Sequence, residues 1–230
     1  ARHLATPDAV KSACILDLYR SALDLHAEWG AGVESLASAF LTGIGEQSRT
    51  LLGGDVQVSL TQRAASAGEY TFMSQYGRVS ESATLRAMAY AVKNNALAER
   101  NLIELKAVDN KWPLFGAAEL APAQSINAAL ACTDICGAVA ERTLLDRLHV
   151  QPGAILRIGS ANFRLSARID KEPDRVSGGF DLGPHILIST DGLKRTGLVT
   201  VGSIINYQYR VAFNQPTTSE AFESAANQAF

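Results

Sequence analysis

The 230-residue chain has little of what marks several protein classes. Lys and Arg total 21 against 23 Asp and Glu, and no basic run occurs, so nucleic acid is not an expected partner. The longest uncharged apolar stretch, residues 35–45, falls far short of the roughly 20 residues that a membrane-spanning helix requires. The chain opens ARHLATPDAV, without the apolar segment of a signal peptide. By itself the chain is therefore expected to be soluble.

Cysteine is scarce, with only Cys14, Cys132 and Cys136. An odd count argues against a complete disulfide framework. Cys132 and Cys136 could pair if the backbone bends between them, but two ordinary thiols are the favoured interpretation. Metal sites usually gather more ligands than this.

Catalytic spacings are also missing. His149 and His185 stand alone beside apolar runs, and no G-x-S-x-G elbow surrounds a serine. Gly53-Gly54 lacks the following Lys-Ser/Thr of a phosphate loop and is typical of a helix stop. We therefore expect no enzyme activity, catalytic residue, metal or bound cofactor. A hydrolase with widely separated catalytic residues is the least favoured alternative.

What the sequence does contain is 47% hydrophobic and 19% charged residues, the composition of a packed globular protein. Thr6-Pro7-Asp8 is a helix start, and Val10, Cys14 and Leu18 begin an apolar stripe at helical spacing. A similar pattern ends near Leu52. Residues 1–52 are predicted to form a long N-terminal helical arm.

Strand patterns dominate the remainder, so the predicted fold class is α+β. Alternation and helical spacing predict a two-layer domain from the two discontinuous segments 53–109 and 203–230. Its predicted strands are 55–61, 78–90, 101–108 and 203–213, and its predicted helices are 67–76 and 219–230.

A β-rich subdomain is predicted over 110–202, inserted into the two-layer domain. Its elements are an apolar run at 137–140, a helix at 142–148, two strands joined by Gly159-Ser160, a strand at 185–188 and a helix at 190–195.

The charged segment after the predicted hairpin has two interpretations. Asp170, Glu172 and Asp174 beside Lys171 and Arg175 could form a cation site, but a solvated loop of mixed charge is favoured.

Contacts with a partner or an apolar ligand are expected from aromatic loops. Gly178, Gly179 and Phe180 suggest an accessible loop carrying an aromatic ring, and Trp112 and Phe115 lie in a second turn-rich segment.

Five blocks carry a family resemblance: LTGIGEQSRTLLGGDVQVSLTQR (41–63), GRVSESATLRAMAY (77–90), LIELKAVDNKWPLFG (102–116), LLDRLHVQPGAILRIGSANFRLSARIDKEPDRVSGGFDLGPHILIS (144–189) and TGLVTVGSIINYQYRV (196–211). In this order they resemble the extracytoplasmic core domain of MacB/FtsX-type ABC transporter permeases, most closely the YbbP-like branch.

The resemblance implies a periplasmic domain of a bacterial inner-membrane protein, set between its first two membrane helices. The family fold is a porter-like α/β part with an inserted, β-rich, Sabre-like part. The implied function is to couple ATP-driven helix motion to the handling or export of a hydrophobic or lipid-like substrate. ATP would bind a separate cytoplasmic ATPase, and a periplasmic protein or a second copy would be further partners.

The arm departs from the family, because Asp17, Arg20, Asp24, Glu28 and Glu34 occupy the place of the first membrane helix. Such charges cost about 2.5–3.5 kcal/mol each at bilayer depth. The alternative function is a soluble small-molecule or lipid-binding protein built on the same core. An apolar cavity of roughly 300 Å³ or more would favour it.

Overall fold

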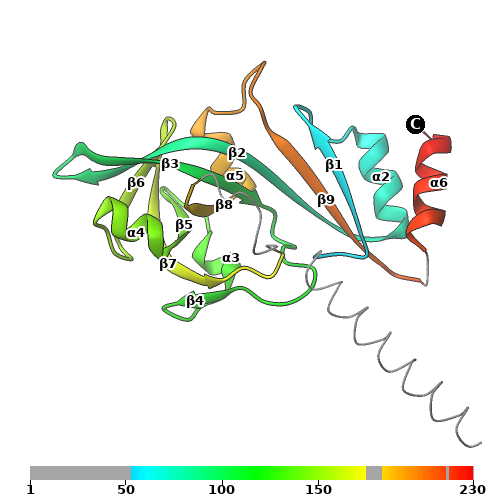
Figure 1. Cartoon of the computed structure of the whole chain (residues 1–230), viewed down its shortest axis with the longest axis horizontal. Coiled ribbons are helices and arrows are strands. Elements are labelled where there is room, and N and C mark those ends of the chain that lie inside the picture. Colours follow the sequence, from blue (N-terminus) through cyan, green and yellow to red (C-terminus); the bar gives the residue numbers. More distant parts are fainter. Residues whose placement is uncertain (1–52, 175–182, 216–217, 230) are drawn as a thin grey trace, which may run out of the picture. The chain divides into compact units, whose positions relative to one another are not determined.

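The computed structural model describes residues 53–174, 183–215 and 218–229, so the arm predicted at 1–52 lies outside the described residues. These residues form an α+β fold in which strands predominate (Figure 1). No helix among them is long and apolar enough to cross a membrane. In chain order the elements are β1 (Val56–Thr61), α2 (Ala67–Tyr76), β2 (Gly77–Lys93), β3 (Ala96–Val108), β4 (Glu119–Ala121), α3 (Ile126–Ala129), β5 (Cys136–Glu141), α4 (Arg142–Leu148), β6 (Ile155–Ile158), β7 (Ala161–Lys171), β8 (His185–Ser189), α5 (Thr190–Thr196), β9 (Asn206–Phe213) and α6 (Ser219–Ala229).

Six strands close into a ring in the order β2, β3, β8, β5, β7 and β6, because β6 pairs with both β7 and β2. The β3–β8 and β5–β7 pairs are parallel, and the others are antiparallel. Apolar side chains from all six strands fill the interior, including Leu85, Ile103, Ala138, Leu156, Phe163 and Ile186. The ring is therefore a packed core.

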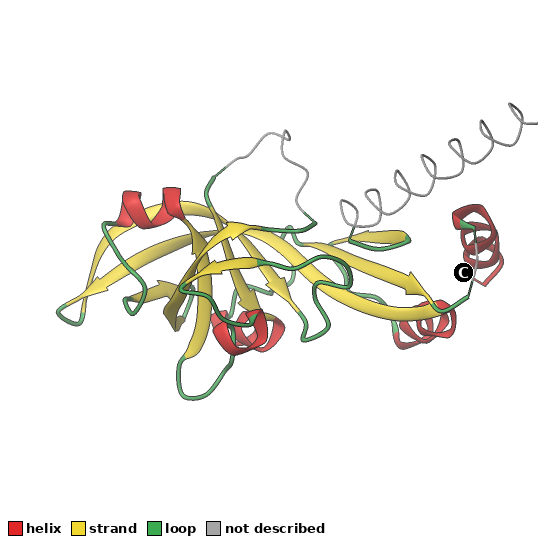
Figure 2. Ribbon diagram, turned by 90° about the horizontal axis from the view of Figure 1, so that it is seen from below, coloured by secondary structure: helices red, strands yellow, loops and turns green. Residues whose placement is uncertain are grey.

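A second core lies at the other end of β2. The first residues of this 17-residue strand pair with β9, and β9 pairs with β1. Helices α2 and α6 cover one face of these three strands (Figures 1 and 2). Phe222 of α6 packs among Phe72, Tyr76 and Phe213, with ring centroids 5.0–5.8 Å apart. This end has the two layers that the sequence predicts.

Local signals explain where the helices begin. Ser66 and Glu69 form a reciprocal capping box at the start of α2. The Ser189 hydroxyl accepts from the Gly192 N–H at the start of α5. Because each cap satisfies an N–H that would otherwise lack a partner, helices as short as α5 are well delimited.

Most predicted elements are confirmed, and α2 and α4 have the predicted bounds. The last strand begins at Asn206 rather than at 203. Asn94 and Asn95, both with positive φ, turn β2 back into β3, so β3 starts earlier than predicted. The division into 53–109 plus 203–230 and 110–202 stays a prediction, since β2 and β3 run continuously through the ring and toward the second core.

The cysteine interpretation was wrong in its favoured form. Cys132 and Cys136 form a disulfide, with their Cα atoms 3.9 Å apart. The chain turns back over residues 133–135, so Cys132 makes an isolated β-bridge with Cys136 at the start of β5. Cys14 lies outside the described residues.

Candidate functional site

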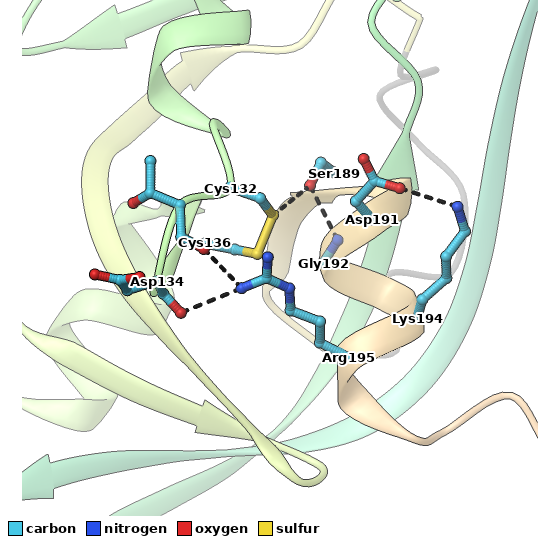
Figure 3. The surroundings of a disulfide bond; sticks show 9 residues. Cys132, Asp134, Cys136, Ser189, Asp191, Gly192, Lys194 and Arg195 are labelled. Carbon is cyan, nitrogen blue, oxygen red and sulfur yellow. Dashed lines mark hydrogen bonds and ion pairs between the residues drawn. A yellow bond between two sulfur atoms is a disulfide. The ribbon is translucent and has the colours of Figure 1, made fainter.

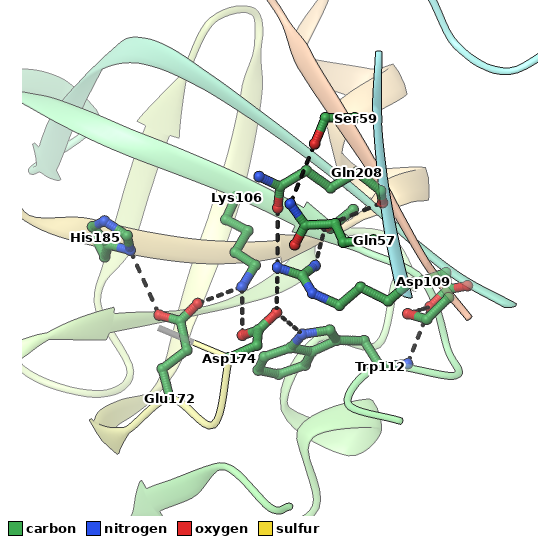
Figure 4. Close-up of polar contacts among 12 residues, drawn as sticks. Gln57, Ser59, Lys106, Asp109, Trp112, Glu172, Asp174, His185 and Gln208 are labelled. Carbon is green, nitrogen blue, oxygen red and sulfur yellow. Dashed lines mark hydrogen bonds and ion pairs between the residues drawn. The ribbon is translucent and has the colours of Figure 1, made fainter. Parts of the chain in front are cut away.

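The most unusual feature of the described region is a group of charged side chains removed from water (Figure 4). We call it the buried ion cluster. It consists of Lys106, Trp112, Glu172, Asp174, His185 and Arg210.

Strand alternation explains why these side chains converge. Tyr209 and Val211 of β9 point toward α2 and α6, so Arg210 between them points to the helix-free face. Leu105 and Ala107 fill the ring, so Lys106 projects from its outer surface. The cluster therefore occupies the junction between the two cores.

Asp174 is the centre of the cluster, and its side chain is 0% exposed. Its Oδ1 accepts from Lys106 Nζ at 2.7 Å, and its Oδ2 accepts from Trp112 Nε1 at 2.9 Å and forms an ion pair with Arg210 Nη2 at 3.0 Å. Burial acts to raise the pKa of this carboxyl, but the charges of Lys106 and Arg210 hold the pKa below its ordinary value. Asp174 is thus a fully satisfied carboxylate.

Glu172 is less completely satisfied. Its Oε1 accepts from Lys106 Nζ at 2.6 Å, while its Oε2 lies 3.5 Å from His185 Nδ1, too long for a well-formed hydrogen bond. Burial acts to raise the pKa of Glu172, yet His185 and Lys106 bring it below its ordinary value. The other imidazole nitrogen of His185, Nε2, lies 3.2 Å from Glu104 Oε2.

The chain leading into β1 packs directly on the cluster. Gly53 has φ +69°, and a Cβ atom there would lie 2.8 Å from Asp174 Cβ and 2.9 Å from Arg210 Cδ. Two residues later, the Asp55 carboxylate accepts from the Phe213 N–H at 2.7 Å. The beginning of β1 is therefore tied both to the cluster and to the end of β9.

The favoured prediction of a solvated mixed-charge loop was wrong for Glu172 and Asp174, because both carboxylates are buried against cations from distant strands. A signal was present in the sequence. Lys106 interrupts an apolar strand, and Arg210 lies between Tyr209 and Val211. A cation inside an apolar strand needs an anion nearby.

Among the described residues, no group of three or more His, Cys, Asp or Glu side chains could hold a metal ion.

The predicted contact residues have different positions. Trp112 is 2% exposed and donates to Asp174, so its ring belongs to the core rather than to an accessible surface. Phe115 is half-buried. Gly178, Gly179 and Phe180 lie outside the described residues. A contact role for these residues stays a prediction.

The described residues border several cavities. One, of about 760 Å³, is lined by Thr84, Leu85, Arg86, Glu104, Leu198, Ser203, Ile204 and Asn206. Another, of about 790 Å³ and beside α4, includes Arg142, Asp146, His149 and Arg168 in its lining. A third, of about 470 Å³, includes Asp109, Asn127, Cys132, Ser189 and Asp191. All three have polar or charged groups in their walls.

Comparison with known proteins relates the chain to transporters. No family model matches it. The chain is 22% identical over 198 residues to the uncharacterized ABC transporter permease YbbP of Escherichia coli K12, a match that covers 84% of this chain and 23% of YbbP. The chain thus spans about a quarter of that relative's length.

Two of the solved structures that match the chain do so with TM-scores below 0.5. The extracellular domain of the noncanonic ABC-type transporter YknZ from Gram-positive bacteria matches with a TM-score of 0.47 and 12% identity, covering 71% of this chain and 78% of that one. The periplasmic region of MacB from Actinobacillus actinomycetemcomitans matches with a TM-score of 0.45 and 9% identity, covering 80% and 86%.

The match to YbbP supports the family resemblance carried by the five sequence blocks, and the described residues have the α+β fold expected from that resemblance. Over most of its length, the chain is similar to a segment of an ABC transporter permease of the YbbP-like branch.

Proposed function

We propose that this chain is the periplasmic domain of an inner-membrane ABC permease and that it transmits motion without catalysing a reaction itself. The observation that carries the proposal is the match to YbbP over 84% of the chain. ATP would be bound and hydrolysed by a separate cytoplasmic subunit.

The path of the chain supports a role in transmitting motion. β1 and β9 are neighbouring antiparallel strands, with Val56 opposite Val211. The chain therefore enters β1 and leaves β9 at the same end of this strand pair. A domain inserted between two consecutive membrane helices needs this arrangement, because both helices meet the domain on one side.

The buried ion cluster connects the start of β1 rigidly to the ring strand β3, so motion at β1 can be transmitted to the ring. Gly53 rests on Asp174 and Arg210, and Asp174 binds Lys106 of the ring strand β3. Buried, fully hydrogen-bonded charges hold their geometry tightly, because any displacement leaves a charge unpaired away from water. A pull on the start of β1 or on β9 would therefore reach β3.

The Cys132–Cys136 disulfide supports a periplasmic location for this domain. Disulfides persist in oxidising compartments such as the bacterial periplasm and are rare in the cytosol.

The alternative, a binding protein for lipid or a small apolar molecule, has weaker support. Side chains fill the ring, and the 760 Å³ cavity has Arg86 and Glu104 in its wall beside Leu198 and Ile204. The cavity has the volume and the largely apolar lining expected for a ligand site, so the alternative rests on this cavity and not on the interior of the ring, which is filled.

The test uses the complete parent protein reconstituted in lipid vesicles with its ATPase subunit. Lys106→Met breaks the cluster, whereas Lys93→Met removes an exposed ion pair with Glu99 at the tip of the β2–β3 hairpin. If motion is transmitted through the buried ion cluster, only Lys106→Met should change the coupling between ATP hydrolysis and transport. Equal behaviour of both variants and the wild type, or a parent protein that does not fractionate with membranes, would exclude the proposed function.

A further inference from the structure

The Cys132–Cys136 disulfide, whose surroundings are shown in Figure 3, is not needed to stabilise the fold. It closes a loop of only three intervening residues, and short loops gain the least from a crosslink in the chain-entropy account. Cys136 is already anchored, because β5 pairs with both β7 and β8 inside the ring. The fold around it therefore does not depend on the bond.

The two sulfur-bearing residues differ in accessibility. Cys136 is 1% exposed and belongs to the core of the ring. Cys132 is half-buried and lines the 470 Å³ cavity together with Ser189 and Asp191. A thiol arriving from solvent through this cavity meets Cys132, while Cys136 is shielded.

Ser189 is placed to assist at Cys132. Its Oγ lies 3.2 Å from Cys132 Sγ and already accepts a hydrogen bond from the Gly192 N–H. A disulfide sulfur carries no hydrogen, so the hydroxyl is the donor to Cys132. When the disulfide is opened, the same hydroxyl can donate to the Cys132 thiolate and stabilise its charge.

The loop is held closed independently of the bond. Arg195 Nη1 donates to the carbonyls of Thr133 at 2.8 Å and Asp134 at 3.1 Å, and the Gly137 N–H donates to the Ala131 carbonyl at 2.9 Å. These contacts keep the two thiols close after reduction, so the bond can form again.

We infer that Cys132 and Cys136 are a reversible thiol–disulfide exchange site for a dithiol reductant, with Cys132 as the attacked residue. This inference is independent of the transport role proposed above. A thiolate of the dithiol attacks Cys132 Sγ and forms a mixed disulfide, while the Cys132–Cys136 bond breaks and Cys136 leaves as a thiolate that takes a proton from water.

The second thiol of the dithiol, as a thiolate, then attacks the dithiol's own sulfur in the mixed disulfide. This step closes the dithiol into a disulfide and releases the Cys132 thiolate. The dithiol loses two electrons and the cysteine pair gains them.

The first test treats the folded chain, carrying Cys14→Ser, with dithiothreitol and then removes the dithiothreitol before denaturant is added. Free thiols are trapped with iodoacetamide and identified by mass spectrometry. We expect Cys132 and Cys136 to be labelled after denaturation and trapping, while the circular dichroism spectrum of the reduced protein before trapping matches that of the oxidised one. A bond that opens only in denaturant, or a protein that unfolds when reduced, would overturn the inference.

The second test compares the reaction rates of the two cysteine thiols. In the same background, Cys136→Ser leaves Cys132 and Cys132→Ser leaves Cys136, and each thiol reacts with an aromatic disulfide reagent. Because thiol reactivity depends on accessibility and thiolate character, Cys132 should react at least about tenfold faster. Equal rates, or a faster Cys136, would refute the assigned order of attack.

A third measurement keeps both Cys132 and Cys136, so its result does not depend on whether the single-cysteine variants fold. The reduced Cys14→Ser chain is mixed with oxidised glutathione and quenched with acid at early times, before the second thiol displaces glutathione, and the transient adduct is mapped by mass spectrometry. The adduct is expected on Cys132, and an adduct predominantly on Cys136 contradicts the inference.

Discussion

Replacing Lys106 with Met tests whether the buried ion cluster is needed for stability. Lys106 Nζ binds Glu172 at 2.6 Å and Asp174 at 2.7 Å, and the two carboxylate side chains are 4% and 0% exposed. The Met side chain fills similar volume but leaves Glu172 with only the long contact to His185. Removing one partner of a buried pair costs about 3–5 kcal/mol. We expect the lower end, about 3 kcal/mol, because Asp174 keeps Arg210 and Trp112.

The pH dependence of this loss has a definite sign. Glu172 and Asp174 have folded-state pKa values below their ordinary values, so their contribution to wild-type stability is present at neutral pH. It is lost as the pH falls from about 4 through the lowered folded values. In Lys106→Met, burial of Glu172 is no longer balanced by that cation, and protonation relieves the cost. The difference between variant and wild type should therefore shrink as the pH falls toward about 4.

Urea unfolding followed by fluorescence measures both effects. The chain has two tryptophans, so a Trp29→Phe background leaves Trp112, whose ring lies 5.0 Å from Lys106 Nζ. At pH 7 the free energy of unfolding should fall by about 3 kcal/mol, which corresponds to roughly 6–12 °C in melting temperature. Lys93→Met, which breaks an exposed pair, should match the wild type. A Lys106→Met protein as stable as the wild type at pH 7, or a deficit that does not change with pH, would refute this reasoning.

Three further predictions concern the packing that supports the cluster and the second core. Gly53→Ala should cost about 1–3 kcal/mol by urea unfolding, because φ is +69° and the new methyl would meet Asp174 Cβ at 2.8 Å. Gly153→Ala, also at positive φ but with open space around it, should cost less. Phe222→Ala should destabilise the chain by about 3 kcal/mol and reduce helical circular dichroism by releasing α6, and unchanged stability would contradict this packing. Ser66→Ala removes the cap of α2 and should cost about 1 kcal/mol in the same assay, whereas a neutral effect would mean that the cap is dispensable.

Local elements were predictable because their causes are local. The alternation of β1, the capping serine before α2 and the Gly159-Ser160 turn act within a few residues of chain. The pairing of these strands was not predictable in the same way. Closure of the ring depends on β6 meeting β2, whose residues lie more than sixty positions earlier, and no local pattern specifies that partner.

The candidate site shows the same limit. Asp174 looked like a loop carboxylate because its sequence neighbours are charged. Its partners, Lys106 and Arg210, come from β3 and β9, and only folding brings them within hydrogen-bond distance. The disulfide was misjudged for a related reason. Whether Cys132 and Cys136 pair depends on the turn over residues 133–135, and the sequence carries no decisive signal for that turn.

The sequence by itself determined the fold class and the approximate places of most helices and strands, because periodicity, capping and turn chemistry are short-range. Its five ordered blocks separately carried the resemblance to YbbP-like permeases. Only the tertiary structure decided that six strands close around a filled core, that β1 and β9 lie side by side, and that five ionisable residues and a tryptophan share one buried site. The physical reason is the cost of burying charge. An isolated lysine or aspartate prefers water, and it is buried here only because distant strands supply its counter-charge in the folded state.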